Sequence, residues 1–172
     1  MLFAINSKAE ENNIKYYSED SGILSLMYHR FDENKYPSTN IQMDIFKEQM
    51  SIINTLNYKF HDPQHLQKDF NTTKNEKKIL ITIDDAFLSF YKVAWPYLKR
   101  EKIPFILFVS TEAVGKTGYM SWEQIQEIEK ESHAYIGNHS HSHNYLVDLK
   151  TENFLSDINT SIKIFNQHLG YN

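Results

Sequence analysis

Short apolar runs alternate along the chain with longer stretches in which apolar residues recur at helical spacing. The clearest run is KKILITIDD, where the continuous, mostly β-branched residues 79–83 end at two carboxylates. Such a run is typical of a strand that is buried on both faces of a parallel sheet. By the same pattern we expect strands at residues 22–29, 58–60, 77–83, 103–110 and 133–140.

Helical spacing and capping residues predict helices between and after these strands. One should begin at a Thr39 or Asn40 cap, and another should cover residues 87–100, where Pro96 kinks or divides it. Residues 61–77 are polar and predict at most one or two helical turns.

Two further helices are marked by their ends. Ser121 and Gln124 form a capping-box pattern at the start of a helix over residues 121–131. A last helix should run from a Thr151 cap to a stop at Gly170. Its apolar face is expected to contain Phe154, Ile158, Ile162, Phe165 and Leu169. The alternation of strands and helices predicts one α/β domain around a parallel sheet or barrel.

Composition is consistent with one globular domain, because 172 residues with 41% hydrophobic residues suffice for a core. The net charge of -4 and the scattered lysines make nucleic acid an unexpected partner. Cysteine is absent, so a metal site must use His, Asp or Glu. No apolar run reaches the ~18 to 20 residues of a membrane span. We expect residues 1–20 to be a tail or a signal remnant, and residues 21–172 to be the domain.

The candidate functional residues lie at the ends of the predicted strands. In α/β folds, functional residues usually lie at the carboxyl ends of the strands. His29 follows the first predicted strand, and Asp84 and Asp85 follow the strand of residues 77–83. Ionising two carboxylates at close range is costly unless a cation lies beside them. The simpler interpretation is a solvated loop in which one aspartate caps the next helix.

The segment HSHSH follows the last predicted strand and offers imidazole ligands. His139 and His143 are four residues apart, which brings both rings to one face of a helical turn. An extended segment would also bring His141 to that side. Gly137-Asn138 favours a turn, so we expect His141 to point away and to serve packing or substrate contact. The alternative is a histidine-rich surface loop without a fixed ligand.

Two histidines and one aspartate leave coordination positions open, as catalytic zinc sites do. Zinc is the divalent metal we expect first, and cobalt, nickel and iron accept the same ligands. A spare carboxylate beside such an ion can take a proton from water, which predicts hydrolysis of an acyl group.

Two of these segments resemble motifs of one family, the polysaccharide deacetylases with a NodB-homology domain, carbohydrate esterase family four. TIDDA at residues 82–86 resembles its motif T-F-D-D-G, and HSHSH matches H-S/T-x-x-H. The resemblance implies a distorted (β/α) barrel with Asp84 as catalytic base. It also implies a metal held by Asp85, His139 and His143.

A second resemblance concerns the substrate. LMYHRF and YPSTN are similar to segments of exported deacetylases that act on poly-N-acetylglucosamine in biofilm matrix. This likeness implies N-deacetylation of an acetylated polysaccharide outside the cytoplasm, with Tyr28, His29 and His141 as substrate-binding residues. A glycan-binding module with little turnover, or an O-acetyl esterase for xylan-type polymers, is the alternative.

The chain also departs from the family pattern. Ala86 replaces a glycine, so we expect that the turn after Asp85 needs no positive φ. The family's late Leu-x-His motif, which carries the general acid, is not found before Asn172. We therefore expect a domain that is incomplete at its C-terminus.

Overall fold

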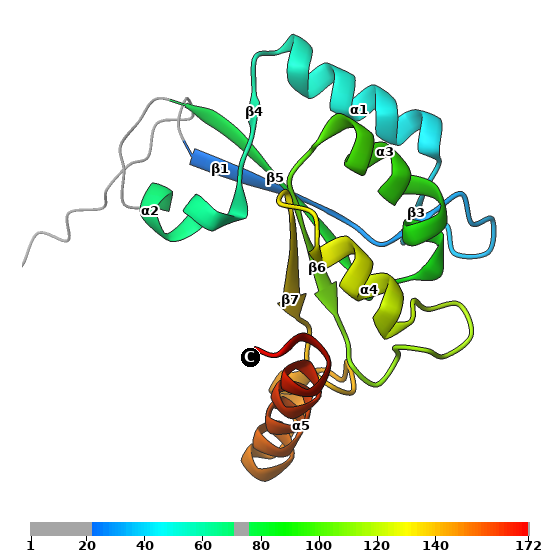
Figure 1. Ribbon diagram of the computed structural model, residues 1–172, viewed down its shortest axis with the longest axis vertical. Helices are drawn as coiled ribbons and strands as arrows, with labels where there is room; N and C mark the ends of the chain where they lie inside the picture. The colour runs from blue at the N-terminus through cyan, green and yellow to red at the C-terminus, as the bar shows by residue number, and fades with distance from the viewer. Residues whose placement is uncertain (1–21, 71–75, 172) are drawn as a thin grey trace, which may run out of the picture.

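The computed structural model describes residues 22–70 and 76–171 and contains a parallel sheet with helices packed against it (Figure 1). The predicted tail of residues 1–20 lies outside the described residues. The main sheet has the order β1-β5-β6-β7, and β4 pairs with the start of β5. A separate parallel pair joins β2 to β3. The strands are β1 (Gly22–Tyr28), β2 (Arg30–Phe31), β3 (Asn40–Ile41), β4 (Lys59–Phe60), β5 (Lys77–Asp84), β6 (Phe105–Val109) and β7 (Ala134–Asn138).

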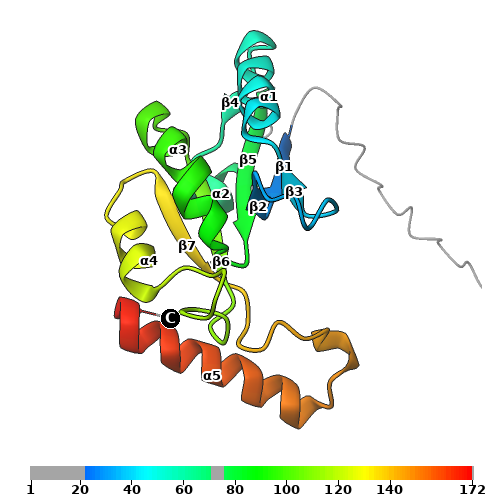
Figure 2. The same ribbon diagram turned by 90° about the vertical axis from the view of Figure 1, so that its right-hand side faces the viewer.

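Helices α1, α3 and α4 lie along the same side of the sheet, whereas α5 lies beyond the carboxyl ends of its strands (Figures 1 and 2). The α-helices are α1 (Met43–Thr55), α2 (Leu66–Phe70), α3 (Trp95–Glu101), α4 (Trp122–Glu129) and α5 (Thr151–Leu169). Shorter helical turns are η1 (Pro63–His65), η2 (Phe90–Ala94) and η3 (Leu146–Asp148). Among the residues described, none of the helices combines the length and the apolarity that a membrane crossing requires.

Strand β5 is the centre of the core. Every residue of β5 from Ile79 to Asp84 is buried, because β1 covers one edge while β4 and β6 cover the other. Burial of one isoleucine side chain contributes about 1.5–3 kcal/mol, and this strand carries three of them at alternate positions, Ile79, Ile81 and Ile83. The core thus holds β5 rigidly and fixes the place where it ends.

The predicted α/β architecture with a parallel sheet is confirmed. In the described residues β1 and β7 form the two edges of the main sheet. Closure of a distorted barrel therefore stays a prediction.

The predicted start of α1 is wrong. Thr39 and Asn40 instead belong to the β2-β3 region, where the Thr39 carbonyl oxygen accepts a hydrogen bond from Arg30 N at 3.0 Å. Helix α1 begins at Met43, whose N–H donates to Asp32 Oδ1 at 2.7 Å. A carboxylate that is distant in sequence thus caps the helix, and spacing within the helix gives no sign of it.

The helical stretch over residues 87–100 is divided, as Pro96 suggested. Its first part, η2, is a π-helical segment, and Pro96 then lies in the first turn of α3. Proline is tolerated in a first turn because its missing N–H would have no intrahelical partner there.

The predicted ends of α4 and α5 are largely confirmed. Ser121 and Gln124 form the capping box, and Gly170 ends α5 with a φ of 79°. The N-cap of α5 is Lys150, so the predicted Thr151 cap is wrong by one residue. The predicted apolar face is confirmed in part. Phe165 is buried and Leu169 packs against the core, whereas Phe154 is exposed and Asp157 and Ser161 are buried as well.

Candidate metal centre

Neighbouring strands bring the candidate residues to one edge of the sheet. Asp84 is the last residue of β5, and the register places it level with Phe108 of β6. Phe108 in turn is level with Gly137 of β7. Because parallel strands end at the same edge, Asp85 and His139 leave the sheet close to each other.

The chain turns sharply after β5. Asp85 has a φ of 71° and Ala86 a φ of 52°, both in the left-handed region. For residues other than glycine this conformation costs about 1–2 kcal/mol each. The expectation that this turn needs no positive φ is therefore wrong. Ala86 is buried and its carbonyl oxygen accepts a hydrogen bond from Met120 N at 2.9 Å, contacts that hold the turn in place.

The histidine segment turns later than predicted. Gly137 and Asn138 still belong to β7, and the positive φ values occur at Ser140, with 66°, and at His143, with 57°. Asn138 Oδ1 accepts from Ser140 N at 2.9 Å, and Ser140 Oγ accepts from His143 N at 3.2 Å. This compact turn brings the rings of His139 and His143 together, with their centroids 4.9 Å apart.

Asp85, His139 and His143 converge at the strand ends. Asp85 Oδ1 lies 3.1 Å from His143 Nε2 and 3.6 Å from His139 Nε2. In a tetrahedral zinc site with bonds of about 2.0–2.2 Å, neighbouring ligand atoms are about 3.3–3.6 Å apart. One potential ligand atom from each of the three residues lies within 4.8 Å of the others.

The surroundings of Asp85 also favour a bound cation. Its Oδ1 is buried and accepts no hydrogen bond of good geometry, despite the short distance to His143. A buried carboxylate oxygen without a partner is costly unless a positive charge compensates it. The side chain of His143 is 55% exposed, so a cation held here would keep an open side. The residues present therefore fit a divalent metal ion.

Asp84 lies beside this group without belonging to it. Its Oδ2 is 4.0 Å from His139 Nε2, and its Oδ1 is buried without a hydrogen-bond partner. Burial raises the pKa of Asp84, and the nearby imidazoles of His139 and His29 oppose this shift. Asp84 thus takes up a proton more readily than an ordinary aspartate.

Tyr28 and His29, which we expect to bind substrate, have different surroundings. The Tyr28 ring packs against Phe46 of α1 at 4.9 Å, and its hydroxyl donates to Gln49 Oε1 at 2.8 Å. Burial raises the pKa of Tyr28 to about 12. His29 is half-buried, and its charge influences the pKa of Asp84. The substrate role of both residues stays a prediction.

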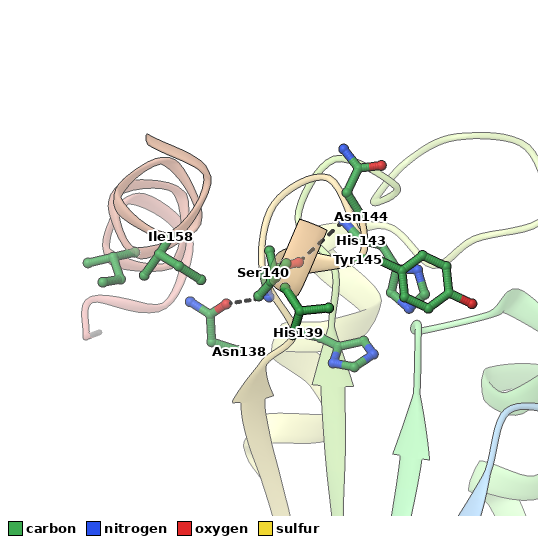
Figure 3. A pocket seen from close by; sticks show the side chains of 10 residues that line it. Asn138, His139, Ser140, His143, Asn144, Tyr145 and Ile158 are labelled. Carbon is green, nitrogen blue, oxygen red and sulfur yellow. Dashed lines mark hydrogen bonds between the residues drawn. The ribbon is translucent and has the colours of Figure 1, made fainter. Parts of the chain in front are cut away.

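Cavities open on both sides of the metal-binding group. The larger, of about 1060 Å³, lies between His139, His143, residues 144–147 and Ile158 of α5 (Figure 3). It contains neither carboxylate. A smaller cavity of about 280 Å³ contains Asp85 and His143. The rest of the smaller cavity is lined by Ser110, Glu112, Ala113, Lys116, Tyr119, His141 and Ser142. The centre is thus bordered by a larger, mainly apolar cavity and a smaller, mainly polar one.

Two residues that support the histidine loop were not identified from the sequence. Thr111 Oγ1 is 2.8 Å from His141 Nδ1, and His141 does not belong to the three-residue metal-binding group. Asp157 of α5 accepts hydrogen bonds from the backbone N–H groups of His141 and Ser142. The only feature of the sequence that points to Asp157 is its position on the same face of the predicted helix as Ser161 and Phe165.

Comparisons with known proteins agree with this geometry. A family model described as polysaccharide deacetylase matches residues 71–172. YxkH of Bacillus subtilis (strain 168), whose name places it among the polysaccharide deacetylases, is 25% identical over 142 residues. That match covers 81% of this chain and 50% of YxkH, so the chain spans about half the length of this curated relative.

Solved structures show the same fold. The structure of IcaB from Ammonifex degensii is 27% identical, with a TM-score of 0.76, and the match covers 87% of this chain and 70% of that one. The Streptococcus pyogenes deacetylase PplD, solved in complex with acetate, is 22% identical with a TM-score of 0.76 and the same coverage.

Proposed function

The chain belongs to the polysaccharide deacetylase family, and from this we propose that it removes N-acetyl groups from polymers that contain N-acetylglucosamine. The observation that carries the proposal is the convergence of Asp85, His139 and His143 beside Asp84, whose Oδ1 is buried without a hydrogen-bond partner. This arrangement combines a cation site with a separate base, the two groups that metal-assisted amide hydrolysis uses.

In the proposed mechanism Asp85, His139 and His143 hold a divalent ion, for which zinc is our first choice. When bound, such an ion supplies Lewis acidity, which polarises an acyl carbonyl and lowers the pKa of water. Cobalt, nickel and iron accept the same ligands and are the alternatives.

Asp84 is the proposed general base. Its carboxylate takes a proton from water as the water oxygen bonds to the acetyl carbon. The carbon–nitrogen bond then breaks as the leaving nitrogen takes up the proton that Asp84 accepted. The products are the free amine and acetic acid, which ionises to acetate. A general base is most efficient when its pKa is close to the working pH, and burial moves the pKa of Asp84 in that direction.

The substrate class rests on the likeness of LMYHRF and YPSTN to poly-N-acetylglucosamine deacetylases. We propose that Tyr28, His29 and His141 contact the sugar. We also propose that the protein acts outside the cytoplasm, because its polymeric substrates lie there. Fractionation of the native cells tests this location.

The decisive test is release of acetate and free amine from acetylated glucosamine oligomers in the presence of Zn²⁺ or Co²⁺. Asp84→Asn should lower the rate by about 10²–10⁴-fold, the usual contribution of a general base. His139→Ala should weaken metal binding as well as the rate. The matched controls are Asp44→Asn and His65→Ala, since both residues are exposed and lie outside the centre.

The outcomes separate the alternatives. Equal amounts of acetate and amine support N-deacetylation, whereas acetate without amine from acetylated xylan indicates an O-acetyl esterase. Binding of the oligomer without acetate release indicates a glycan-binding module. Parental rates in both Asp84→Asn and His139→Ala would refute the proposed mechanism.

A further inference from the structure

Asp157 is a buried carboxylate at the contact between α5 and the histidine loop. It is 9% exposed and faces the loop rather than solvent. Its Oδ1 accepts a hydrogen bond from His141 N at 2.8 Å, and its Oδ2 accepts one from Ser142 N at 2.9 Å. Both carboxylate oxygens are thus committed to the backbone of the loop.

Several other backbone groups of the loop form hydrogen bonds with β6 and the residues that follow it. His139 N donates to the Val109 carbonyl oxygen at 3.0 Å, and Ser110 Oγ donates to the His139 carbonyl oxygen at 3.0 Å. The carbonyl oxygens of Ser140 and His141 accept from Thr111 N and Glu112 N, at 3.1 and 3.0 Å. Strand β6 and the segment after it therefore hold one side of the loop.

The N–H groups of His141 and Ser142 belong to the other side. They lie between the two residues of positive φ, Ser140 and His143, where the backbone cannot form a regular helix or strand. An N–H group that is shielded from water and has no partner is costly, so these two part-buried groups require an acceptor. Asp157 supplies one carboxylate oxygen to each of them.

We propose that Asp157 is a positioning residue for the metal centre, a role that rests on the proposed function. His141 and Ser142 are the middle of the span from His139 to His143, so the carboxylate fixes the part of the backbone that sets the separation of the two rings. The ring of His143 is half-exposed and its orientation depends on that backbone. Asp157 itself does not reach the ion or the substrate.

The test compares Asp157→Asn with Phe165→Leu. Asparagine keeps the shape of the side chain but replaces one acceptor by a donor that faces an N–H group. Phe165 is buried on the same helix and packs against Trp122 of α4, so its truncation weakens α5 without touching the loop. We measure the Kd for Co²⁺, the Tm of the metal-free protein, and the exchange rates of the loop amides.

Loss of a residue that orients metal ligands usually weakens metal binding about 10–100-fold. We expect Asp157→Asn to raise the Kd for Co²⁺ by about this factor, and Phe165→Leu to leave it nearly unchanged at a similar loss of Tm. The amides of His141 and Ser142 should exchange faster only in Asp157→Asn. Asp157→Glu, which keeps the charge and both acceptors, should recover part of the affinity.

Equal Kd values in Asp157→Asn and Phe165→Leu, or unchanged exchange of the two amides, would overturn the positioning role. If Asp157→Asn does not fold, Asp157→Glu is the deciding variant. An Asp157→Glu protein with altered exchange of the two amides but the parental Kd for Co²⁺ would also overturn the positioning role. Failure of the parent protein to bind Co²⁺ would refute the proposed metal centre. The exchange rates in metal-free protein would still show whether Asp157 holds the loop.

Discussion

Gly137→Ala would add a methyl group where a ring of β6 lies against the backbone of β7. A Cβ at residue 137 would lie 2.5 Å from Cδ1 and Cε1 of Phe108 and 3.1 Å from Cγ2 of Ile106. Carbon atoms in favourable contact are about 3.5–4.0 Å apart, so the ring must move by about 1 Å. The Phe108 ring centroid lies 6.1 Å from that of His139, and the displacement therefore reaches a candidate metal ligand.

Two effects of this substitution oppose each other. Overpacking a core costs about 1–3 kcal/mol, whereas replacing a glycine inside a strand gains about 0.5–1 kcal/mol. The overpacking is larger, so we expect Gly137→Ala to lower the free energy of unfolding by about 1–2 kcal/mol. In a domain of this size the Tm should fall by about 2–8 °C.

The assay is thermal and urea unfolding of the parent, Gly137→Ala, Phe108→Leu and the double variant. Leucine has no ring at the site of overlap, so the double variant should be more stable than the sum of the two single effects predicts. We expect a coupling of at least about 0.5 kcal/mol. Strict additivity, or an unchanged Tm in Gly137→Ala, would refute the close-approach argument.

Two further changes test local features of the fold. Ser121→Ala removes the side-chain acceptor for Gln124 N, a hydrogen bond of 3.4 Å, and should cost about 0.5–1 kcal/mol in urea unfolding, with no effect on the metal-binding loop. An unchanged midpoint would count against the cap. His61 is buried, and burial lowers its pKa, with a further lowering by the charge of Lys78. Below a pH of about 6.5 the unfolded chain therefore binds more protons than the folded protein does. Stability should therefore decline from pH 7.5 to 5.5, and His61→Gln, which does not titrate, should reduce this decline; identical declines in both proteins would contradict the argument.

The strands and the chemistry at their ends were predictable because each depends on short-range pattern. The apolar run before Asp84 predicts a buried strand without any knowledge of the rest of the chain. The carboxyl ends of parallel strands then meet at the same edge of the sheet. Two histidines four residues apart require only a tight turn to meet. The pattern therefore predicted that one of the two carboxylates would lie beside the histidine pair, and only the family resemblance pointed to Asp85.

Features that depend on distant contacts could not be predicted in the same way. Asp32 caps α1 from a different segment, and the buried face of α5 includes Asp157 because the histidine loop supplies N–H donors there. Gly137 was interpreted as a turn residue, yet its lack of a side chain accommodates Phe108 from the neighbouring strand. Ala86 adopts a positive φ that its identity disfavours, because tertiary contacts hold the turn.

The most direct test of the account is the stoichiometry and Kd of Zn²⁺ binding, measured by calorimetry for the parent, Asp85→Asn and the exposed control Asp44→Asn. The convergence of Asp85 with His139 and His143 predicts one ion per chain in the parent and in the control. It also predicts that Asp85→Asn abolishes or greatly weakens binding. A parent protein that binds no zinc, or an Asp85→Asn variant with the parental Kd, would contradict the proposed centre.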